Sequence, residues 1–438
     1  MRANTEGELL TPGTSLNTLL GKQVKVVRLL GEGGQGQVYA VDYSGTPKAL
    51  KWFKPNGIGE KPGAFYDNLK SNVYKGAPSA AFLWPEDIAR QGNRFGYVMP
   101  LRPQGYHEIT DFLLGQARFS SYRTVVDASL QIVSAFRLLH NAGYSYQDLN
   151  DGNFFVEPET GKVLICDNDN VAPNKTDTGI RGKPRFMAPE IVTQARVPDN
   201  LSDRFSMAVI LFVIFCMDHP LEGRHSLVPA LTPELQERLY GSEALFIMDE
   251  SNESNRPVPG VHKNVLRVWK FLPDFIQQQF QRAFCKKALT EPNARPSELE
   301  WIKTLVHFRS MIVPCTCGNE VFLKTAAPCS CENCRRTLSV PFKIQLREYD
   351  IPGAAGSRIY RCQTEICDAE KALQPVSAII ASNKDRTKLG LKNMSDTPWR
   401  VEFADGRTGS VEPKAVLPLS DGTELTVNSE KIHISANK

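Results

Sequence analysis

Apolar and polar positions alternate with a period of two near the start of the chain. The runs KVVRLL, QVYAVDY and KALKWF are rich in β-branched and aromatic residues and are separated by turns, which predicts antiparallel strands within residues 22–54. A further strand is expected over 95–103, and a helix over 63–76. Residues 1–20 are expected to be a mobile lead-in.

From about Ile109 onward the period changes to that of a helix. Residues 121–142 form the clearest amphipathic segment. Further helical segments are predicted at 202–217, 233–239, 265–287 and 297–309. A β-rich start followed by a helical body predicts one two-lobed domain over residues 21–308.

The last part of the chain returns to short strand-like runs. The turn signals DGRTG (405–409) and LSDG (419–422) separate these runs. Residues 344–438 are therefore expected to form a small all-β domain, either a sandwich or a barrel. Its sequence resembles a forkhead-associated module but has no identifiable phosphate-reading arginine–serine set, so we interpret it as an interaction module of unknown ligand.

Composition and charge narrow the class of protein. Of the 438 residues, 41% are hydrophobic and 23% are charged, as in ordinary globular proteins. Because 52 Lys and Arg are nearly balanced by 48 Asp and Glu, neither nucleic acid nor a membrane is expected as the main partner. The N-terminus lacks a signal-peptide pattern, and the longest apolar run, 207–217, is shorter than the about 20 residues of a membrane span. We therefore expect a cytoplasmic protein.

A glycine-rich turn between the first two strands is the first candidate for chemistry. It has the spacing G-x-G-x-x-G-x-V and comprises Gly31, Glu32, Gly33, Gly34, Gln35, Gly36 and Val38. Such a turn can lay backbone N–H groups over the phosphates of a nucleotide, but taken alone it is equally well a structural hairpin. Lys51 stands on the next strand but one, at the spacing of a lysine that reaches the phosphates.

Two acidic loops follow the long helix. Asp148 is followed five residues later by Asn153, a D-x4-N pattern that combines a proton acceptor with an amide ligand for a metal. Asp167 ends a short apolar strand 14 residues further on and is a second candidate metal ligand. Each loop by itself could also be an ordinary acidic turn.

Three more motifs follow in order: MAPE (187–190), DRFS (203–206) and the segment around Arg295. With all six motifs in sequence, residues ~22–308 resemble a eukaryotic-type protein kinase domain with a β-rich and a helical lobe. The resemblance implies ATP and Mg²⁺ (or Mn²⁺) as cofactors. It makes Asp148 the catalytic base and Lys51 the phosphate-binding residue, with Asn153 and Asp167 holding the metal.

The resemblance also implies roles for residues outside the reacting centre. Ala49, Met99 and Leu101 are expected to join the glycine-rich loop in binding the nucleotide. In the helical lobe, Glu190 and Arg295 are expected to form a buried ion pair, and Asp203 to brace the backbone of the catalytic loop.

The sequence departs from the kinase pattern at several positions. Tyr146 and Gln147 replace the His-Arg pair before the base, so activation through a phosphorylated loop is not expected. The metal motif reads Asp-Asn-Asp in place of Asp-Phe-Gly. The glutamate of the lobe-crossing helix has no clear counterpart: Asp67 is the best candidate and Glu60 a weaker one, while Asp67 could equally be an exposed carboxylate.

One departure has the form of a paired exchange. Ser/Thr kinases carry a lysine two residues after the base, where this chain has Asn150, and a threonine before the A-P-E motif, where it has Lys183. Either Lys183 supplies from the other side the ammonium that stabilises the transferring phosphoryl group, or it is a surface lysine with no such role.

Cysteines cluster after the helical lobe. Cys315 and Cys317 are separated by 13 residues from the pair Cys331 and Cys334, and two turns that present paired thiolates predict a structural Zn²⁺ site within a zinc-ribbon-like module, residues 312–343. Cys329 could replace Cys331, and free thiols or an iron–sulfur cluster are the alternatives. Cys362 and Cys367 could bind a second metal.

The segments GAPSAAFLWP and GYVMPLRP, with the cysteine module, resemble kinases of the bacterial tellurite-resistance-associated phosphorylation triad. This resemblance implies a protein substrate, with a phosphatase and a von Willebrand A-type protein as partners. An active protein kinase is therefore the leading interpretation. A pseudokinase or ATP-binding scaffold and a small-molecule kinase are the alternatives.

Overall fold

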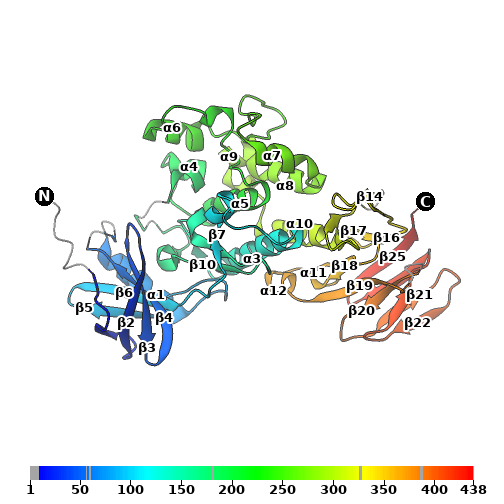
Figure 1. The fold of residues 1–438 in the computed structure, drawn as a ribbon, viewed down its shortest axis with the longest axis horizontal. Coiled ribbons are helices and arrows are strands. Elements are labelled where there is room, and N and C mark those ends of the chain that lie inside the picture. The colour runs from blue at the N-terminus through cyan, green and yellow to red at the C-terminus, as the bar shows by residue number, and fades with distance from the viewer. Residues whose placement is uncertain are drawn as a thin grey trace.

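The computed structural model describes residues 9–55, 57–58, 61–176, 178–179, 182–324, 328–384 and 388–437. Figure 1 shows a β-rich lobe at the N-terminal end of the molecule, a helical body in the middle and a second β-rich region at the C-terminal end. The described chain therefore has the architecture that the change of period along the sequence predicts.

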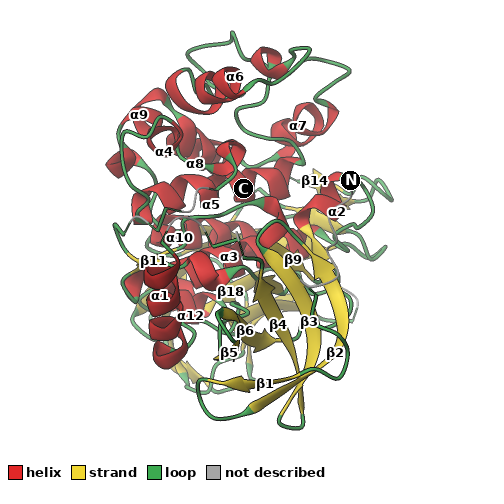
Figure 2. Cartoon of the chain, turned by 90° about the vertical axis from the view of Figure 1, so that its left-hand side faces the viewer, coloured by secondary structure: helices red, strands yellow, loops and turns green. Residues whose placement is uncertain are grey.

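The N-terminal lobe is a closed antiparallel barrel with the strand order β1-β2-β3-β4-β6-β5. Its strands are β1 (Ser15–Thr18), β2 (Gln23–Glu32), β3 (Gly36–Tyr43), β4 (Thr46–Phe53), β5 (Asp87–Gln91) and β6 (Arg94–Pro100). Helix α1 (Pro62–Lys75) lies beside the barrel (Figure 2). The expected mobile lead-in is wrong for residues 9–20, because β1 pairs with both β2 and β5 and so closes the barrel.

The period-two pattern explains why these segments form strands. Alternate side chains of β2 and β3, such as Val24, Val26, Tyr39 and Val41, point into one buried cluster. At Gly36 a Cβ atom would lie 2.3 Å from the carbonyl oxygen of Trp52, so only glycine allows β3 to approach β4 this closely.

The second lobe is helical and contains the largest apolar core. Its main helices are α2 (Ile109–Leu113), α3 (Tyr122–Asn141), α4 (Pro189–Val192), α5 (Asn200–Cys216), α6 (Pro233–Glu237), α7 (Lys263–Val268), α8 (Asp274–Phe284), α9 (Lys286–Thr290) and α10 (Glu298–Ser310). The helical segment predicted over 265–287 is confirmed, but it is divided between α7, α8 and the start of α9. A short turn over Trp269–Phe271 ends α7, and Pro273 starts α8 in a new direction.

The loops that lie between the two lobes are flanked by short strands of the second lobe. They are β7 (His107–Glu108), β8 (Tyr144–Ser145), β9 (Phe154–Val156), β10 (Val163–Ile165) and β11 (Ala172–Pro173). Helix α5 is buried along nearly its whole length, which explains the apolar run 207–217 as core. Within the described parts of the chain, every helix is too short or too polar to span a bilayer.

After α10 come two small hairpins, which surround the cysteine cluster, and then two larger sheets. The hairpin strands are β12 (Ile312–Pro314) with β13 (Glu320–Phe322), and β14 (Cys329–Ser330) with β15 (Thr337–Leu338). One sheet has the order β17-β16-β25-β24-β21-β22 and the other β18-β19-β20-β23, and side chains from both form one apolar cluster. The tail is thus a β sandwich.

The strands of the larger sheet are β16 (Phe342–Gln345), β17 (Asp350–Gly353), β21 (Trp399–Glu402), β22 (Thr408–Val411), β24 (Thr423–Val427) and β25 (Glu430–Ala436). The smaller sheet has β18 (Arg358–Tyr360), β19 (Val376–Ser382), β20 (Leu389–Asn393) and β23 (Val416–Pro418). Two short helices, α11 (Arg361–Thr364) and α12 (Ala369–Ala372), connect β18 to β19.

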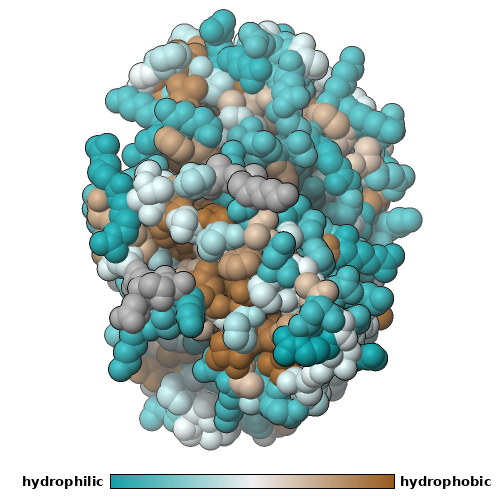
Figure 3. All heavy atoms as spheres, turned by 90° about the vertical axis from the view of Figure 1, so that its right-hand side faces the viewer, coloured by the Kyte–Doolittle hydropathy of each residue, from teal (hydrophilic) through white to brown (hydrophobic). Residues whose placement is uncertain are grey.

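The tail packs directly against the helical lobe. Cys362, Ala369 and Ala372 belong to the main apolar core of the helical lobe. At the start of α3, Arg123 donates hydrogen bonds to the carbonyl oxygen of Ile312 at 2.5 Å and to the Tyr360 hydroxyl at 2.7 Å. The face at the tail end of the molecule is mostly hydrophilic, with apolar atoms gathered near its centre (Figure 3).

Candidate active site

The glycine-rich turn joins β2 to β3 and lies at the edge of the barrel that faces the helical lobe. The backbone N–H of Gly33 donates to the carbonyl oxygen of Gly36 at 2.8 Å, which closes the hairpin. The side chain of Gln35 turns back from this hairpin, and its Oε1 accepts a hydrogen bond from Lys51 at 3.0 Å. The turn and the lysine are therefore adjacent.

Lys51 extends from β4 across the gap between the lobes. Its Nζ lies 3.3 Å from Oδ1 of Asp167 and 3.1 Å from both carboxylate oxygens of Asp169. Burial alone would lower the pKa of Lys51, but the two carboxylates outweigh it and raise the pKa. The lysine is thus held as a cation between the lobes.

The catalytic loop is a tight, hydrogen-bonded turn. Asn153 donates its amide nitrogen to the carbonyl oxygen of Asp148 at 2.7 Å, and Asn150 donates to Oδ1 of Asp148 at 3.2 Å. A Cβ atom on Gly182 would lie 2.9 Å from that same Oδ1, so the backbone at Gly182 passes close to the carboxylate. Burial raises the pKa of the Asp148 carboxyl to about 6, and the charges of Asp167 and Asp169 act in the same direction.

The Asp-Asn-Asp motif follows β10 and divides its three side chains between different surroundings. Asp167 has a φ of 54°, in the left-handed region, and its side chain is 40% exposed. Asn168 points inward and donates to the carbonyl oxygens of Leu83 and Ile165. Asp169 is fully buried beside Lys51. The position that is aromatic in the Asp-Phe-Gly motif is therefore occupied here by the buried amide of Asn168.

Asp67, the expected partner of Lys51 on α1, does not meet it. Its side chain is exposed on the helix, and that expectation is wrong. The weaker candidate, Glu60, lies outside the described residues. Asp169 was not predicted as a partner of Lys51, because the contact joins residues of two different lobes. The sequence signal for it is the second acidic residue of the Asp-Asn-Asp motif.

Gln147, which stands where kinases carry arginine, forms hydrogen bonds to Thr176 and Thr178. Its Nε2 donates to the carbonyl oxygen of Thr176 at 2.8 Å, and its Oε1 accepts from the Thr178 hydroxyl at 3.0 Å. A neutral amide therefore makes direct contacts here without a phosphate group.

Lys183 lies over the catalytic loop. Its Nζ is 3.3 Å from Oδ1 of Asp151, and its side chain is 60% exposed. The atom is also 4.0 Å from the position of a Cβ on Gly152. The predicted position facing the loop is confirmed, while the role of the ammonium stays a prediction.

An apolar cluster with side chains from both lobes contains several of the predicted nucleotide contacts. Ala49 and Met99 are buried in one cluster with the half-buried Val38, and Leu164 and Cys166 pack against the same cluster from the other lobe. Leu101 is 37% exposed. Leu164 and Cys166 were not predicted, because nothing local to β10 marks them as facing the barrel.

The helical lobe supports the catalytic loop as the motifs predict. The carboxylate of Asp203 accepts hydrogen bonds from the backbone N–H groups of Tyr146 at 2.7 Å and Gln147 at 3.2 Å. Arg295 forms a two-point ion pair with Glu190, at 2.8 and 2.7 Å, and is 4% exposed. Both predictions are confirmed.

The four predicted cysteine ligands come together between the small hairpins. The Sγ atoms of Cys315, Cys317, Cys331 and Cys334 all lie within 4.8 Å of one another. Two Sγ pairs, 315 with 334 and 317 with 331, are separated by 3.6 Å. Zn–S bonds of about 2.3 Å in a tetrahedron require about 3.8 Å between sulfurs, so the cluster fits zinc. Cys329 is outside this cluster.

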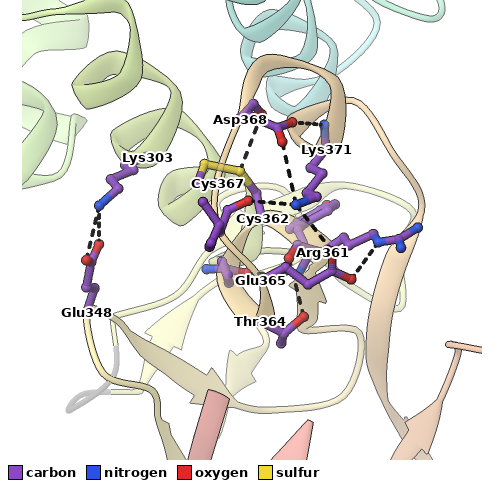
Figure 4. The surroundings of a disulfide bond; sticks show 12 residues. Lys303, Glu348, Arg361, Cys362, Thr364, Glu365, Cys367, Asp368 and Lys371 are labelled. Atoms are coloured by element: carbon purple, nitrogen blue, oxygen red, sulfur yellow. Dashed lines mark hydrogen bonds and ion pairs between the residues drawn. A yellow bond between two sulfur atoms is a disulfide. The ribbon is translucent and has the colours of Figure 1, made fainter. Parts of the chain in front are cut away.

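Cys362 and Cys367 form a disulfide instead of a second metal site (Figure 4). The suggestion that this pair binds a metal is therefore wrong, because the two sulfur atoms are bonded to each other and neither is a free thiolate. The bond closes the loop between α11 and α12, where Lys371 forms ion pairs with Glu365 and Asp368.

Comparison with known proteins agrees with this geometry. The family model described as protein kinase domain matches residues 24–268. The chain is 25% identical over 332 residues to "Protein kinase YegI" of Escherichia coli O157:H7, covering 69% of this chain and 47% of that protein. It is 27% identical over 226 residues to the "DNA damage-responsive serine/threonine-protein kinase RqkA" of Deinococcus radiodurans, covering 49% and 32%.

A third relative is eukaryotic. "Serine/threonine-protein kinase Nek11" of Macaca fascicularis is 25% identical over 170 residues, covering 37% of this chain and 26% of that protein. The chain spans about half the length of the YegI proteins that it matches. The family model covers more than half of the chain and includes the glycine-rich turn, Lys51, Asp148, Asn153 and Asp167. On these grounds the chain belongs to the protein kinase family, in its eukaryotic type.

Proposed function

We propose that this chain is a protein serine/threonine kinase that transfers the γ-phosphoryl group of ATP to a hydroxyl group of a protein partner, and also to itself. One observation carries the proposal. Lys51 from the barrel lies 3.3 Å from Asp167 of the helical lobe, and both are close enough to Asp148, in the loop that ends at Asn153, for their charges to act on its pKa. A phosphate binder, a metal ligand and a base are thus close to one another.

Mg²⁺ (or Mn²⁺) fits the oxygen donors of Asn153 and Asp167. Asn153 uses its amide nitrogen to bind the carbonyl of Asp148, which leaves its Oδ1 as the atom that can coordinate a cation. The half-exposed carboxylate of Asp167 offers a second hard oxygen ligand. When bound, the metal supplies positive charge against the phosphate oxygens.

The chain's own residues account for the remaining steps. Lys51 neutralises the charge of the phosphates, and the backbone N–H groups of the glycine-rich turn approach them closely. The oxygen of the substrate hydroxyl forms a bond to the γ-phosphorus while the bond from phosphorus to the bridging oxygen of ADP breaks. The hydroxyl proton passes to Asp148. Because Gln35, Asp167 and Asp169 occupy the hydrogen-bonding positions of Lys51, we expect the phosphates to displace one of these contacts when they bind.

The cysteine cluster is proposed as a structural zinc site. Four thiolates fill a tetrahedral shell and leave no open position for catalysis. The Asn333 amide lies 3.6 Å from the sulfur of Cys317 and supports the cluster as a hydrogen-bond donor. Zinc would therefore fix the hairpins that join the helical lobe to the β sandwich.

Partners are proposed on the resemblance to the tellurite-resistance-associated triad. A phosphatase and a von Willebrand A-type protein are the expected associates, and the β sandwich is the expected interaction module. An inactive ATP-binding scaffold and a small-molecule kinase are the competing functions.

Incubation with γ-labelled ATP and Mg²⁺ tests the proposal. The wild-type chain should label itself or an added protein substrate, and Asp148→Asn should lower the rate about 10²–10⁴-fold, the usual contribution of a general base. Asp405→Asn, which changes an exposed carboxylate in the tail, should leave the rate unaltered. Nucleotide binding without transfer would favour a scaffold, and transfer only to small molecules would exclude a protein kinase.

A further inference from the structure

The partner that holds Lys51 in place does not come from helix α1. The single acidic residue of α1 is Asp67, which is exposed. Among the described residues, the ion pairs of Lys51 are with Asp167 and Asp169, both in the loop after β10. The lysine is therefore positioned from within the metal-binding loop.

Asp169 has the geometry of a structural anchor. Both of its carboxylate oxygens lie 3.1 Å from Nζ of Lys51, and its side chain is fully buried. The hydroxyl of Tyr97, on β6, donates a further hydrogen bond to Oδ1 at 3.2 Å. Asp167 makes one contact to the lysine and remains 40% exposed. The two carboxylates thus differ in surroundings: Asp167 is accessible to solvent, and Asp169 is enclosed beside the lysine.

Burial stabilises the ion pair between Lys51 and Asp169 against separation. A buried charge without a partner is strongly unfavourable, so the removal of either partner leaves the other in an unfavourable environment. Lys51 is 5% exposed, and Asp169 neutralises it at short range. The contact therefore fixes the direction of the ammonium before any nucleotide arrives.

Helix α1 contacts the same loop in a different way. Asn68 and Asn72 both donate their side-chain amides to the carbonyl oxygen of Val171, at 2.8 and 2.9 Å. The indole of Trp84 donates to the carbonyl oxygen of Asn72 at 2.9 Å. Neutral amides of α1 thus hold the backbone two residues beyond Asp169, and none of these contacts involves Lys51.

We propose that Asp169 is the positioning residue for Lys51, in the role that a glutamate of the lobe-crossing helix has in other protein kinases. The orientation of Lys51 is then set by the loop after β10 and by Tyr97, and α1 acts on it only through its hydrogen bonds to the backbone of that loop. Displacement of α1 would consequently not switch this kinase off by breaking a lysine–glutamate pair. The inference rests on the proposed kinase function, since it assigns a role within the same site.

Three variants test the proposal in steady-state assays at varied ATP and at varied protein substrate. Asp169→Asn keeps the shape and removes the charge, and it should lower kcat/KM for ATP about 10–100-fold, with a higher KM for ATP and an unaltered KM for the protein substrate. Tyr97→Phe should raise KM for ATP about two- to fivefold, as expected for one lost hydrogen bond. Asp67→Asn on α1 is the matched control and should behave as wild type.

A change in KM for ATP without a change in KM for the protein substrate distinguishes a positioning role from a general structural defect. A structural lesion lowers the fraction of active enzyme and leaves KM for ATP unaltered. An Asp169→Asn variant within threefold of wild type would overturn the proposal, as would a loss in Asp67→Asn. If Asp169→Asn does not fold, Tyr97→Phe decides, and an unaltered KM for ATP in that variant counts against the anchor.

The test remains informative if the wild-type chain transfers no phosphoryl group. That result would refute the proposed function and not the anchor. The dissociation constant of Mg·ATP, measured by titration calorimetry, then replaces the rate. We expect about tenfold weaker binding for Asp169→Asn than for Asp67→Asn, and equal binding would refute the role of Asp169.

Discussion

A histidine between three helices offers a sharp test of how the helical lobe is held together. His140 of α3 places its Nε2 3.0 Å from Oδ2 of Asp203 on α5 and its Nδ1 2.8 Å from Oε1 of Glu298 on α10. Arg204 donates from Nε to the same Oε1 of Glu298 at 2.8 Å and from Nη2 to its Oε2 at 3.2 Å. Because Asp203 also holds the backbone of the catalytic loop, the ionisation of His140 connects lobe stability to the active site.

The magnitude follows from the pKa of the imidazole. Burial alone would lower this pKa, but Asp203 and Glu298 outweigh it and raise the pKa from 6.5 to about 9. A group with a raised folded-state pKa contributes its full stability below the unfolded value of 6.5 and loses it as the pH rises through 9. The shift corresponds to about 3 kcal/mol at pH 6, about 1.4 kcal/mol at pH 8 and almost nothing at pH 9.5.

The lowered pKa of Glu298, about 2, arises because contacts with His140 and Arg204 outweigh the effect of its burial. Its contact with His140 is the one already counted, so the two shifts are not added. On the acid side the carboxylate contributes fully above its unfolded value of 4.5 and loses this contribution as the pH falls towards 2. The cluster is therefore fully effective between about pH 4.5 and pH 6.5.

Urea unfolding of wild type and His140→Gln at pH 6 and pH 9.5 measures the effect. Far-ultraviolet circular dichroism is the appropriate signal, because most helices belong to this lobe. The free-energy difference between the two proteins should be about 3 kcal/mol larger at pH 6 than at pH 9.5. His225→Gln, at an exposed position, should show no such change. An equal difference at both pH values would refute a charged His140 in the folded state.

Three further perturbations follow from the same structure. Arg295→Met leaves the largely buried Glu190 carboxylate without its partner and should lower the free energy of urea unfolding by about 3–5 kcal/mol. The loss should be smaller when Arg295→Met is combined with Glu190→Gln, and a loss below about 1 kcal/mol would contradict a buried pair. Metal analysis should find one zinc per chain, which is lost in Cys331→Ser and kept in Cys329→Ser. Removal of the metal by a chelator should make residues 312–343 sensitive to protease, and unaltered resistance would count against zinc. Lys183→Ala should lower kcat by more than threefold if its ammonium faces the transferring group, and a smaller change makes it a surface lysine.

Local chemistry explains why much of the site was predictable. The glycine-rich turn, the D-x4-N loop and the paired cysteines are each determined by residues a few positions apart, so their conformations follow from spacing alone. The cysteine spacing was sufficient to group four ligands that the structure brings within 4.8 Å. The same holds for helix α3, whose predicted range 121–142 differs from Tyr122–Asn141 by one residue at each end.

By itself, the sequence predicted where strands give way to helices, because that change depends on side-chain type and on periods of two or 3.6 residues. Its resemblance to protein kinases indicated which residues are the candidates for the chemistry. Only the tertiary structure decided which carboxylate meets Lys51. Asp169 is 118 positions away, and the contact depends on how one lobe packs against the other. The same reason applies to β1, which becomes a strand by joining two others, and to Cys362 and Cys367, whose pairing depends on the loop that brings their sulfurs together.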